Sequence, residues 1–417
     1  MQKYGGTSVG SLSRIESVAD NIIATVRKGH QVVVVLSAMA GETNRLVSLA
    51  QQLDSQPSTR ELDMLMATGE QVSISLLAIA LVKRGISAVS LLAHQIGIAT
   101  NNQFGNARIE NIDTKRLNQA LEQEQVVIVA GFQGQDRDRN VTTLGRGGSD
   151  TSAIALAVAL KASECQIFTD VDGVYSADPR VVESAQRINA LSFEEMLIMA
   201  SLGAKVLHNR AVEYARAHEM PIRVLSSFKP DNGTMVKNIN EMLAENNVSP
   251  VTNLAHHQQD ALICIEGVAD DTVVAQILSV LGENDIEAEL LNVSDSTQLV
   301  KQSQASHGQV NTSKTLRFVI NRHKISHLKT CLSSITKGNS IGTLLINDSV
   351  AKLSAIGNGM KSHAGIVGQF MTMLASEEID ILLISTSELS ISVVIDESLL
   401  FNALRTLHSG FGLDASL

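Results

Sequence analysis

One glycine-rich stretch places two charged side chains where they could bind ligands. Residues 142–150 read Thr-Thr-Leu-Gly-Arg-Gly-Gly-Ser-Asp, and they lie between an apolar run at 126–130 and a small apolar segment at 151–160. This order predicts a buried strand, a loop and a buried helix. Free N–H groups at a helix start favour an anion, and Arg146 can bind a carboxylate or phosphate through its planar guanidinium. Asp150 cannot be there to bind an anion, so it has to orient something cationic. Glycines, one arginine and one aspartate at the start of a helix together indicate a site that handles two anions. An ordinary loop with an N-cap at Ser149 or Asp150 is the alternative.

A second glycine loop stands at the beginning of the chain. Residues 3–10 read Lys-Tyr-Gly-Gly-Thr-Ser-Val-Gly and precede a segment, 11–27, whose apolar residues fall on one helical face. This is typical of a phosphate-binding loop, but the P-loop pattern is not met because Ser11 stands where it requires a lysine. Lys3 would lie at the end of the first strand, over the same phosphates; a solvated strand end is equally compatible.

Further polar side chains follow the apolar run 31–36, which predicts a central parallel strand. In an open α/β sheet the ligand lies beyond the carboxyl ends of the strands. Ser37 and Thr43 come directly after this strand and are candidate hydroxyl donors, although Thr43 could simply cap the next helix.

Two charged residues stand in apolar surroundings. Glu70 interrupts the long apolar helical stretch 62–82; a buried carboxylate is costly unless paired, so it could hold an ammonium group, or else lie on an exposed helix face. Lys205 is embedded in the small apolar residues of 201–206, which suggests a paired site lysine.

A strand at 167–168 runs into a long irregular segment that ends at Arg180. This segment offers hydroxyls, carboxylates and Tyr175, a surface suited to a nucleoside and its phosphates.

Length and composition bound the classes of function. The 417 residues predict two or three domains, and a net charge of −10 argues against nucleic acid or an anionic membrane as the main partner. No uninterrupted apolar run is long enough to span a bilayer, and the N-terminus lacks a signal-peptide pattern. The three cysteines have no metal-ligand spacing, so we expect no protein-bound metal and a reducing, cytoplasmic location.

The C-terminal part contains an internal repeat. Residues 272–295 align without a gap on 365–388, and each copy predicts a strand, an amphipathic helix and two further strands. This is a duplicated βαββαβ, ferredoxin-like unit. Its free sheet edges predict pairing within or between chains, either as a structural dimerisation module or as a sensor of a small ligand. The expected domains are 1–250, 251–330 and 331–417.

Taken together, the motifs resemble the aspartate kinase family over essentially the whole chain. The resemblance rests on the segments 3–10, 36–43, 68–70, 143–150, 169–180 and 203–208, and on the tail at 359–363 and 386–388. It implies an α/β fold in which an amino-acid-kinase domain, with an open and mostly parallel sheet, precedes two ACT domains.

The resemblance also implies residue roles. Lys3 and Lys205 would neutralise the transferred phosphoryl group, and Asp150 would hold both lysines in place. The residues implied in binding aspartate are Ser37, Thr43, Glu70, Arg146 and Ser149. Those implied in binding ATP are Lys3, Tyr4, Gly5, Gly6, Thr169, Asp170, Tyr175, Arg180, Lys205 and Val206.

The implied reaction is ATP-dependent phosphorylation of the β-carboxylate of L-aspartate, the first step of lysine, threonine and methionine biosynthesis, with Mg²⁺ carried on ATP. A carboxylate with a reference pKa of about 3.9 is already ionised at neutral pH, so no general base is needed. Feedback by lysine, threonine or both, a homo-oligomer built through the ACT domains, and a shorter regulatory chain are further expectations. The candidate effector residues are Asp270, Asn292, Ser294, Met360 and Ser385.

Two other functions fit parts of the chain. A kinase acting on glutamate or a nucleoside monophosphate is disfavoured by the duplicated tail and by the Thr-Gly-Glu segment at 68–70. A catalytically silent amino-acid sensor has no use for Lys3, Arg146, Asp150 and Lys205 together.

Overall fold

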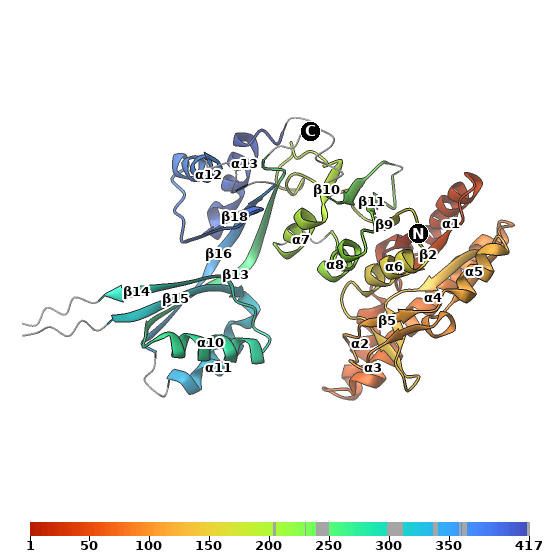
Figure 1. The fold of residues 1–417 in the computed structure, drawn as a ribbon, viewed down its shortest axis with the longest axis horizontal. Helices are drawn as coiled ribbons and strands as arrows, with labels where there is room; N and C mark the ends of the chain where they lie inside the picture. The colour runs from red at the N-terminus through yellow and green to blue at the C-terminus, as the bar shows by residue number, and fades with distance from the viewer. Residues whose placement is uncertain are drawn as a thin grey trace, which may run out of the picture. The chain divides into compact units, whose positions relative to one another are not determined.

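We describe a computed structural model, which places residues 1–202, 206–229, 231–238, 250–297, 312–336, 341–357, 360 and 365–414. The chain divides into two compact units. The N-terminal unit comprises Met1–Tyr175 and Arg187–Val248, and the C-terminal unit comprises Ser176–Gln186 and Ser249–Ser416. Figure 1 shows the helices and strands of both units.

The N-terminal unit is built on an eight-stranded sheet with the order β10-β12-β11-β9-β1-β2-β6-β3. All neighbouring strands in it run parallel except β11 and β12. The open, mostly parallel sheet expected from the apolar runs is therefore confirmed. Its strands are β1 (Gln2–Tyr4), β2 (Val33–Leu36), β3 (Ala88–Leu91), β6 (Val126–Ala130), β9 (Cys165–Thr169), β10 (Ala190–Ser192), β11 (Ile222–Ser226) and β12 (Thr234–Lys237).

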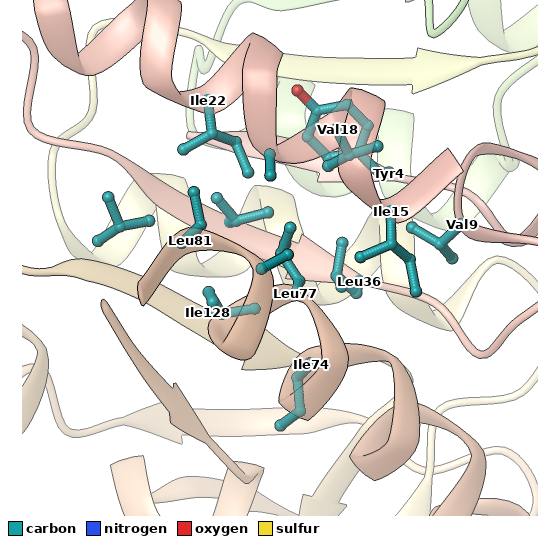
Figure 2. Close-up of a cluster of buried hydrophobic side chains, with 14 of the residues drawn as sticks. Tyr4, Val9, Ile15, Val18, Ile22, Leu36, Ile74, Leu77, Leu81 and Ile128 are labelled. Atoms are coloured by element: carbon teal, nitrogen blue, oxygen red, sulfur yellow. The ribbon is translucent and has the colours of Figure 1, made fainter. Parts of the chain in front are cut away.

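Helices cover both faces of this sheet. Buried residues of α1 and α4, such as Ile22 and Leu77, form one core with Val34 and Leu36 of β2, as Figure 2 shows for several of them. The other face, where Val33 and Val35 point, is covered by α6. The helices are α1 (Leu12–Arg27), α2 (Glu42–Leu53), α3 (Thr59–Met66), α4 (Thr68–Lys83), α5 (Lys115–Glu122), α6 (Gly148–Ala159), α7 (Phe193–Ser201) and α8 (Asn209–Ala217), with 3₁₀ turns η1 (Gly6–Val9) and η2 (Ala93–Ile96).

The stretch Thr59–Lys83, which contains α3 and α4, is long and apolar enough to cross a membrane by length and composition alone. It nevertheless has the character of a core helix pair. Leu77 and Leu81 are fully buried in the core that α4 shares with the sheet, and Asp63 and Glu70 are buried against protein groups.

The N-terminal unit also contains a smaller sheet with the order β5-β4-β7-β8, in which β4 and β5 pair antiparallel. Its strands are β4 (Ile98–Thr100), β5 (Ile109–Ile112), β7 (Gln133–Gln135) and β8 (Val141–Thr143). Since β8 ends two residues before Gly145, this sheet helps to place the glycine-rich loop.

The C-terminal unit contains a six-stranded antiparallel sheet with the order β14-β15-β13-β16-β18-β17. Helices α10 and α11 pack against each other, and so do α12 and α13 (Figure 1). The elements are β13 (Asn253–Val268), α10 (Asp271–Glu283), β14 (Glu289–Thr297), β15 (Thr312–Asn321), η3 (Arg322–Lys324), α11 (Ile325–Thr336), β16 (Thr343–Ile356), α12 (Gly365–Ser376), β17 (Leu383–Thr386), β18 (Ser390–Asp396), η4 (Glu397–Leu399) and α13 (Leu400–Gly410).

This sheet contains both βαββαβ repeats, which share the two long strands β13 and β16. Residues 260–266 of β13 pair with 343–350 of β16 and complete the first repeat. Residues 253–257 of β13 pair with 352–356 of β16 and complete the second. The duplicated ferredoxin-like topology is confirmed, but its two copies are interlocked.

The expected boundary between residues 330 and 331 is corrected by this arrangement. It falls inside α11, a helix of the first repeat, and the second repeat takes its last strand from the start of β13. The C-terminal unit also includes Ser176–Gln186. There the Ser176 carbonyl accepts a hydrogen bond of 2.7 Å from the N–H of Leu254, and the Ser176 hydroxyl lies 2.9 Å from Nε2 of His408.

Candidate active site

A cavity of about 570 Å³ opens at the carboxyl ends of β1, β2 and β6, where a parallel sheet is expected to bind ligands. The loops that follow these strands and the glycine-rich loop before α6 form its walls. The lining residues are Lys3, Gly6, Ser37, Ala38, Met39, Ala40, Gly41, Thr43, Asn44, Met66, Glu70, Gly105, Phe132, Thr143, Gly145, Arg146, Gly147, Gly148, Ser149 and Asp150.

The glycine-rich loop needs its glycines for two physical reasons. Gly145 and Gly147 have φ values of 76° and 67°, in the left-handed region. In addition, a Cβ added at Gly147 would lie 2.3 Å from the side chain of His208. Gly147 is the N-cap of α6, so Ser149 and Asp150 lie inside its first turn rather than capping it.

Lys3 and Asp150 form an ion pair inside the cavity. Lys3 Nζ lies 2.7 Å from Asp150 Oδ1, and the two side chains are only 10% and 14% exposed. Strand β1 has just three residues, but it pairs with β2 on one side and β9 on the other, which fixes Lys3. The pair therefore holds a cation at the edge of the cavity.

Glu70 carries a buried carboxylate that is only half satisfied. Its Oε1 accepts a hydrogen bond of 3.0 Å from the N–H of Ala38, whereas Oε2 has no hydrogen-bond partner among the described residues. The side chain is 2% exposed, and burial raises the pKa of Glu70 to about 7. A cationic group entering the cavity would find a carboxylate oxygen ready to accept from it.

The other expected substrate-binding residues, Ser37, Thr43, Arg146 and Ser149, all line the same cavity. The loop after β2 is held in place because Ser37 donates its N–H to the Tyr4 carbonyl at 3.2 Å and accepts from the Ser73 hydroxyl at 2.8 Å. Thr43 is not a helix cap, since Gly41 is the N-cap of α2.

Among the residues expected along the nucleotide phosphates, Gly6 lines the cavity and Gly5 adjoins Lys3. A Cβ at Gly6 would lie 2.9 Å from the Ala38 carbonyl oxygen, so the close approach of two loops requires a glycine there. Tyr4 needs a correction: its side chain is fully buried, stacks on Phe168 at 4.4 Å and lies in the core shown in Figure 2. Any contact of Tyr4 with a nucleotide is limited to its backbone.

Two other expected nucleotide residues, Thr169 and Asp170, lie at the carboxyl end of β9, next to β1. The Tyr175 hydroxyl donates to Asp172 Oδ1 at 2.8 Å. Arg180 is part of the C-terminal unit, where its guanidinium binds both oxygens of Asp178. Val206 is half-buried.

The prediction for Lys205 falls outside the described residues.

The candidate effector residues occupy different environments in the C-terminal unit. Asp270 is the N-cap of α10 and accepts from the N–H of Val273 at 3.0 Å, which is a structural role. Asn292 and Ser294 lie exposed on β14, and Ser385 lies exposed on β17. These two strands contact each other although they are at opposite ends of the strand order. Met360 is buried.

Several cavity-lining residues were not among the predicted site residues, including Asn44, Phe132 and Thr143. Phe132 has a φ of 70°, unusual for an aromatic residue. A signal for it was present, because it follows Gly131, the first residue after the buried strand β6.

Comparison with known proteins identifies two family patterns. Residues 2–226 match the amino acid kinase family, and residues 353–411 match the ACT domain. The chain is 45% identical to an aspartate kinase of Stutzerimonas stutzeri (strain A1501) over 416 residues, which is 100% of this chain and 97% of the relative.

Solved structures agree with this relationship. The crystal structure of an aspartate kinase from Synechocystis superposes with a TM-score of 0.84 at 28% identity and covers 100% of this chain and 98% of that one. E. coli aspartokinase III in complex with aspartate and ADP has a TM-score of 0.76, and in complex with lysine and aspartate 0.77. Both complexes are 25% identical and cover 98% of each chain.

Proposed function

The chain belongs to the aspartate kinase family, and we propose that the cavity between Lys3, Glu70 and Arg146 is where it binds L-aspartate. The γ-phosphoryl group of ATP passes to the β-carboxylate, so that a P–O bond to ADP breaks and an acyl phosphate bond to aspartate forms. The products are ADP and 4-phospho-L-aspartate. The observation that carries this proposal is the buried Oε2 of Glu70, which has no partner among the described residues and lies in the same cavity as two cationic side chains.

The ammonium group and one carboxylate of aspartate each have a complementary partner in the cavity. The Glu70 carboxylate accepts from the α-ammonium group, and Arg146 binds a carboxylate through its guanidinium. Ser37, Thr43 and Ser149 supply hydroxyl groups from three loop positions around the same space. The E. coli structure that contains aspartate and ADP supports this assignment.

The chemistry requires positioning and neutralisation of charge rather than a base. The β-carboxylate is ionised at neutral pH, so the nucleophile needs no deprotonation. Lys3 stabilises the negative charge of the transferred group, with Lys205 as the proposed second cation. Asp150 holds the Lys3 ammonium, and the positive end of the α6 helix dipole favours the same negative charge.

ATP is proposed to lie along the carboxyl ends of β1 and β9, with its phosphates near Gly5 and Gly6. Thr169, Asp170, Tyr175 and Val206 are the proposed contacts of the rest of the nucleotide, and for Arg180 this role stays a prediction from the resemblance. Mg²⁺ would be held mainly by the phosphate oxygens of ATP, as is usual for this ion. It would neutralise charge on the transferred group.

The C-terminal repeats are proposed to regulate the reaction, with lysine, threonine or both as effectors in the cytoplasm. A related enzyme with lysine bound supports an amino-acid effector. Asn292, Ser294 and Ser385, on the contacting strands β14 and β17, are the better-placed effector candidates; Asp270 and Met360 complete the set. We also propose that the free edges of this sheet mediate homo-oligomers, or association with a shorter regulatory chain.

The test of this function is chemical trapping of the product. Hydroxylamine converts an acyl phosphate into a hydroxamate and releases phosphate. With Mg-ATP, L-aspartate and hydroxylamine we expect β-aspartyl hydroxamate, identified by mass spectrometry against synthetic α and β standards. Formation of the α isomer, or no hydroxamate while ADP accumulates, would contradict the proposed acceptor.

A further inference from the structure

Two charged residues that do not line the cavity form hydrogen bonds to the segments that make up part of its wall. The first is Asp63 of α3, which is fully buried. Its Oδ2 accepts from the N–H groups of Gly105, at 2.9 Å, and Thr143, at 2.7 Å. Its Oδ1 accepts from the Thr143 hydroxyl at 2.7 Å. One carboxylate thus joins two cavity-lining residues that are far apart in sequence.

The second is Arg210 of α8, which reaches the same two segments. Its Nη1 donates to the Asn106 side-chain oxygen at 2.6 Å and to the Leu144 carbonyl at 2.7 Å. Its Nη2 donates to the Ala107 carbonyl at 3.0 Å. A rigid guanidinium with three acceptors fixes direction as well as distance.

The two segments, 105–107 and 143–145, are tightly fitted to each other. The N–H of Ala107 donates to the Thr143 carbonyl at 2.8 Å. A Cβ added at Gly145 would lie 3.0 Å from the Gly105 carbonyl oxygen. Arg146 follows directly, so the position of its backbone depends on this contact.

Taking these charged groups out of water, fully for Asp63 and partly for Arg210, is unfavourable in itself. Burial raises the pKa of Asp63 and lowers that of Arg210. If these positions served only to pack the wall against water, neutral side chains would do so without the cost of desolvating a charge. The charged groups instead hold six polar groups of five residues at 2.6–3.0 Å, which is what a wall of defined position requires.

We infer that Asp63 and Arg210 are positioning residues that set the place of Arg146, and thereby the affinity for aspartate; this rests on the proposed function. Neither residue touches the substrate. Both act through the segments 105–107 and 143–145.

The experiment compares steady-state kinetics of the full-length enzyme with Asp63→Asn and Arg210→Lys. The amide of Asn offers one acceptor oxygen instead of two, and a lysine ammonium lacks the planar fork that reaches both segments. We expect each variant to raise KM for aspartate roughly tenfold or more, since small misplacements of binding groups are costly. KM for Mg-ATP should change less than about twofold, whereas a general loss of structure would affect both alike.

Asp136→Asn is the matched control. Asp136 is also buried, at 7% exposure, and its carboxylate accepts from the N–H groups of Asp138 and Asn140 and from the Asn140 amide, at 2.8–3.0 Å. It lies in the turn between β7 and β8 and does not line the cavity. This variant should lower the melting temperature and leave KM for aspartate unchanged.

The inference is overturned if Asp63→Asn and Arg210→Lys lower the melting temperature as Asp136→Asn does, with an unchanged KM for aspartate. If Asp63→Asn does not fold, Arg210→Lys decides by the same two KM values. Failure of the wild-type enzyme to use aspartate is a separate result, which would contradict the proposed function before any variant is compared.

Discussion

Lys3 and Asp150, 2.7 Å apart, join the first strand of the chain to the first turn of α6. The carboxylate holds the ammonium group at the edge of the cavity, where the loop after β1 and the glycine-rich loop meet. The lysine side chain would otherwise sample many rotamers. The ion pair restricts it, and a fixed cation stabilises developing negative charge without reorganising during the reaction.

Replacing Asp150 with alanine should therefore reduce kcat while the protein stays folded. The loss of one such preorganised electrostatic group typically costs about 10²–10³-fold. Asp20→Asn is the control, because it removes an exposed ion pair with Arg84, which contributes little. Near-normal turnover of Asp150→Ala would show that the ion pair has no catalytic role.

Glu70→Gln should weaken aspartate binding selectively. Glutamine can still accept from the Ala38 N–H, but it has no charge for the substrate ammonium. A hydrogen bond to a charged group contributes about 1.5–3 kcal/mol, so KM for aspartate should rise roughly 10- to 100-fold while KM for Mg-ATP stays similar. An unchanged KM for aspartate would remove Glu70 from the binding site.

The same carboxyl group predicts a pH-dependent stability of the ligand-free protein. Burial raises the pKa of Glu70 from 4.5 to about 7, so between these values the folded protein keeps a proton that the unfolded chain has released. The folded state binds more protons, and the free energy of unfolding from this group decreases as pH rises through that window.

Glu70→Gln should remove this decrease in the free energy of unfolding. The variant should melt at a higher temperature than the wild type at about pH 8, and the difference should shrink at about pH 5, where the wild-type Glu70 is protonated. The measurement is thermal unfolding without ligands across this pH range. The same difference in melting temperature at both pH values would be inconsistent with burial of an ionisable Glu70.

Gly147→Ala should prevent the loop from adopting its structure. The φ of 67° is unfavourable for alanine, and its Cβ would overlap His208. We expect loss of aspartate binding, measured by calorimetry, together with a lower melting temperature. Gly85→Ala is the matched control. Gly85 also has a left-handed φ, of 77°, but no heavy atom of the described residues lies within 4 Å of the added Cβ. It should cost about 1–2 kcal/mol of stability and leave aspartate binding intact. Tight binding by Gly147→Ala would argue against this account of the loop.

The interlocked repeats predict which fragments fold. A fragment of residues 331–417 lacks the strand residues 253–257 that complete the second repeat, so it should remain unfolded. A fragment of residues 249–417 contains both long strands and should give dispersed amide signals in NMR spectra. Cooperative unfolding of the shorter fragment would show that the second repeat does not need β13.

Most of the elements could be predicted from sequence because their signals are local. The apolar runs at β2 and β6 and the helical periodicity of α1 each lie within one element. The assignment of β13 and β16 to both repeats could not be predicted, because it depends on the register between strands that are far apart in sequence. The contacts of Asp63 and Arg210 join residues distant in sequence, and no local pattern marks them. For Tyr4 the resemblance indicated a binding position, whereas the phenol packs in the core.

The most direct test of the central claim is ADP release by the purified protein with Mg-ATP and one acceptor at a time: L-aspartate, L-glutamate, N-acetylglutamate or UMP. Each assay is repeated with lysine and with threonine. We predict that, of the four acceptors, only aspartate supports ADP release, and that this release falls when lysine, threonine or both are added. ADP release with another acceptor, and none with aspartate, would contradict the assignment of this cavity to aspartate.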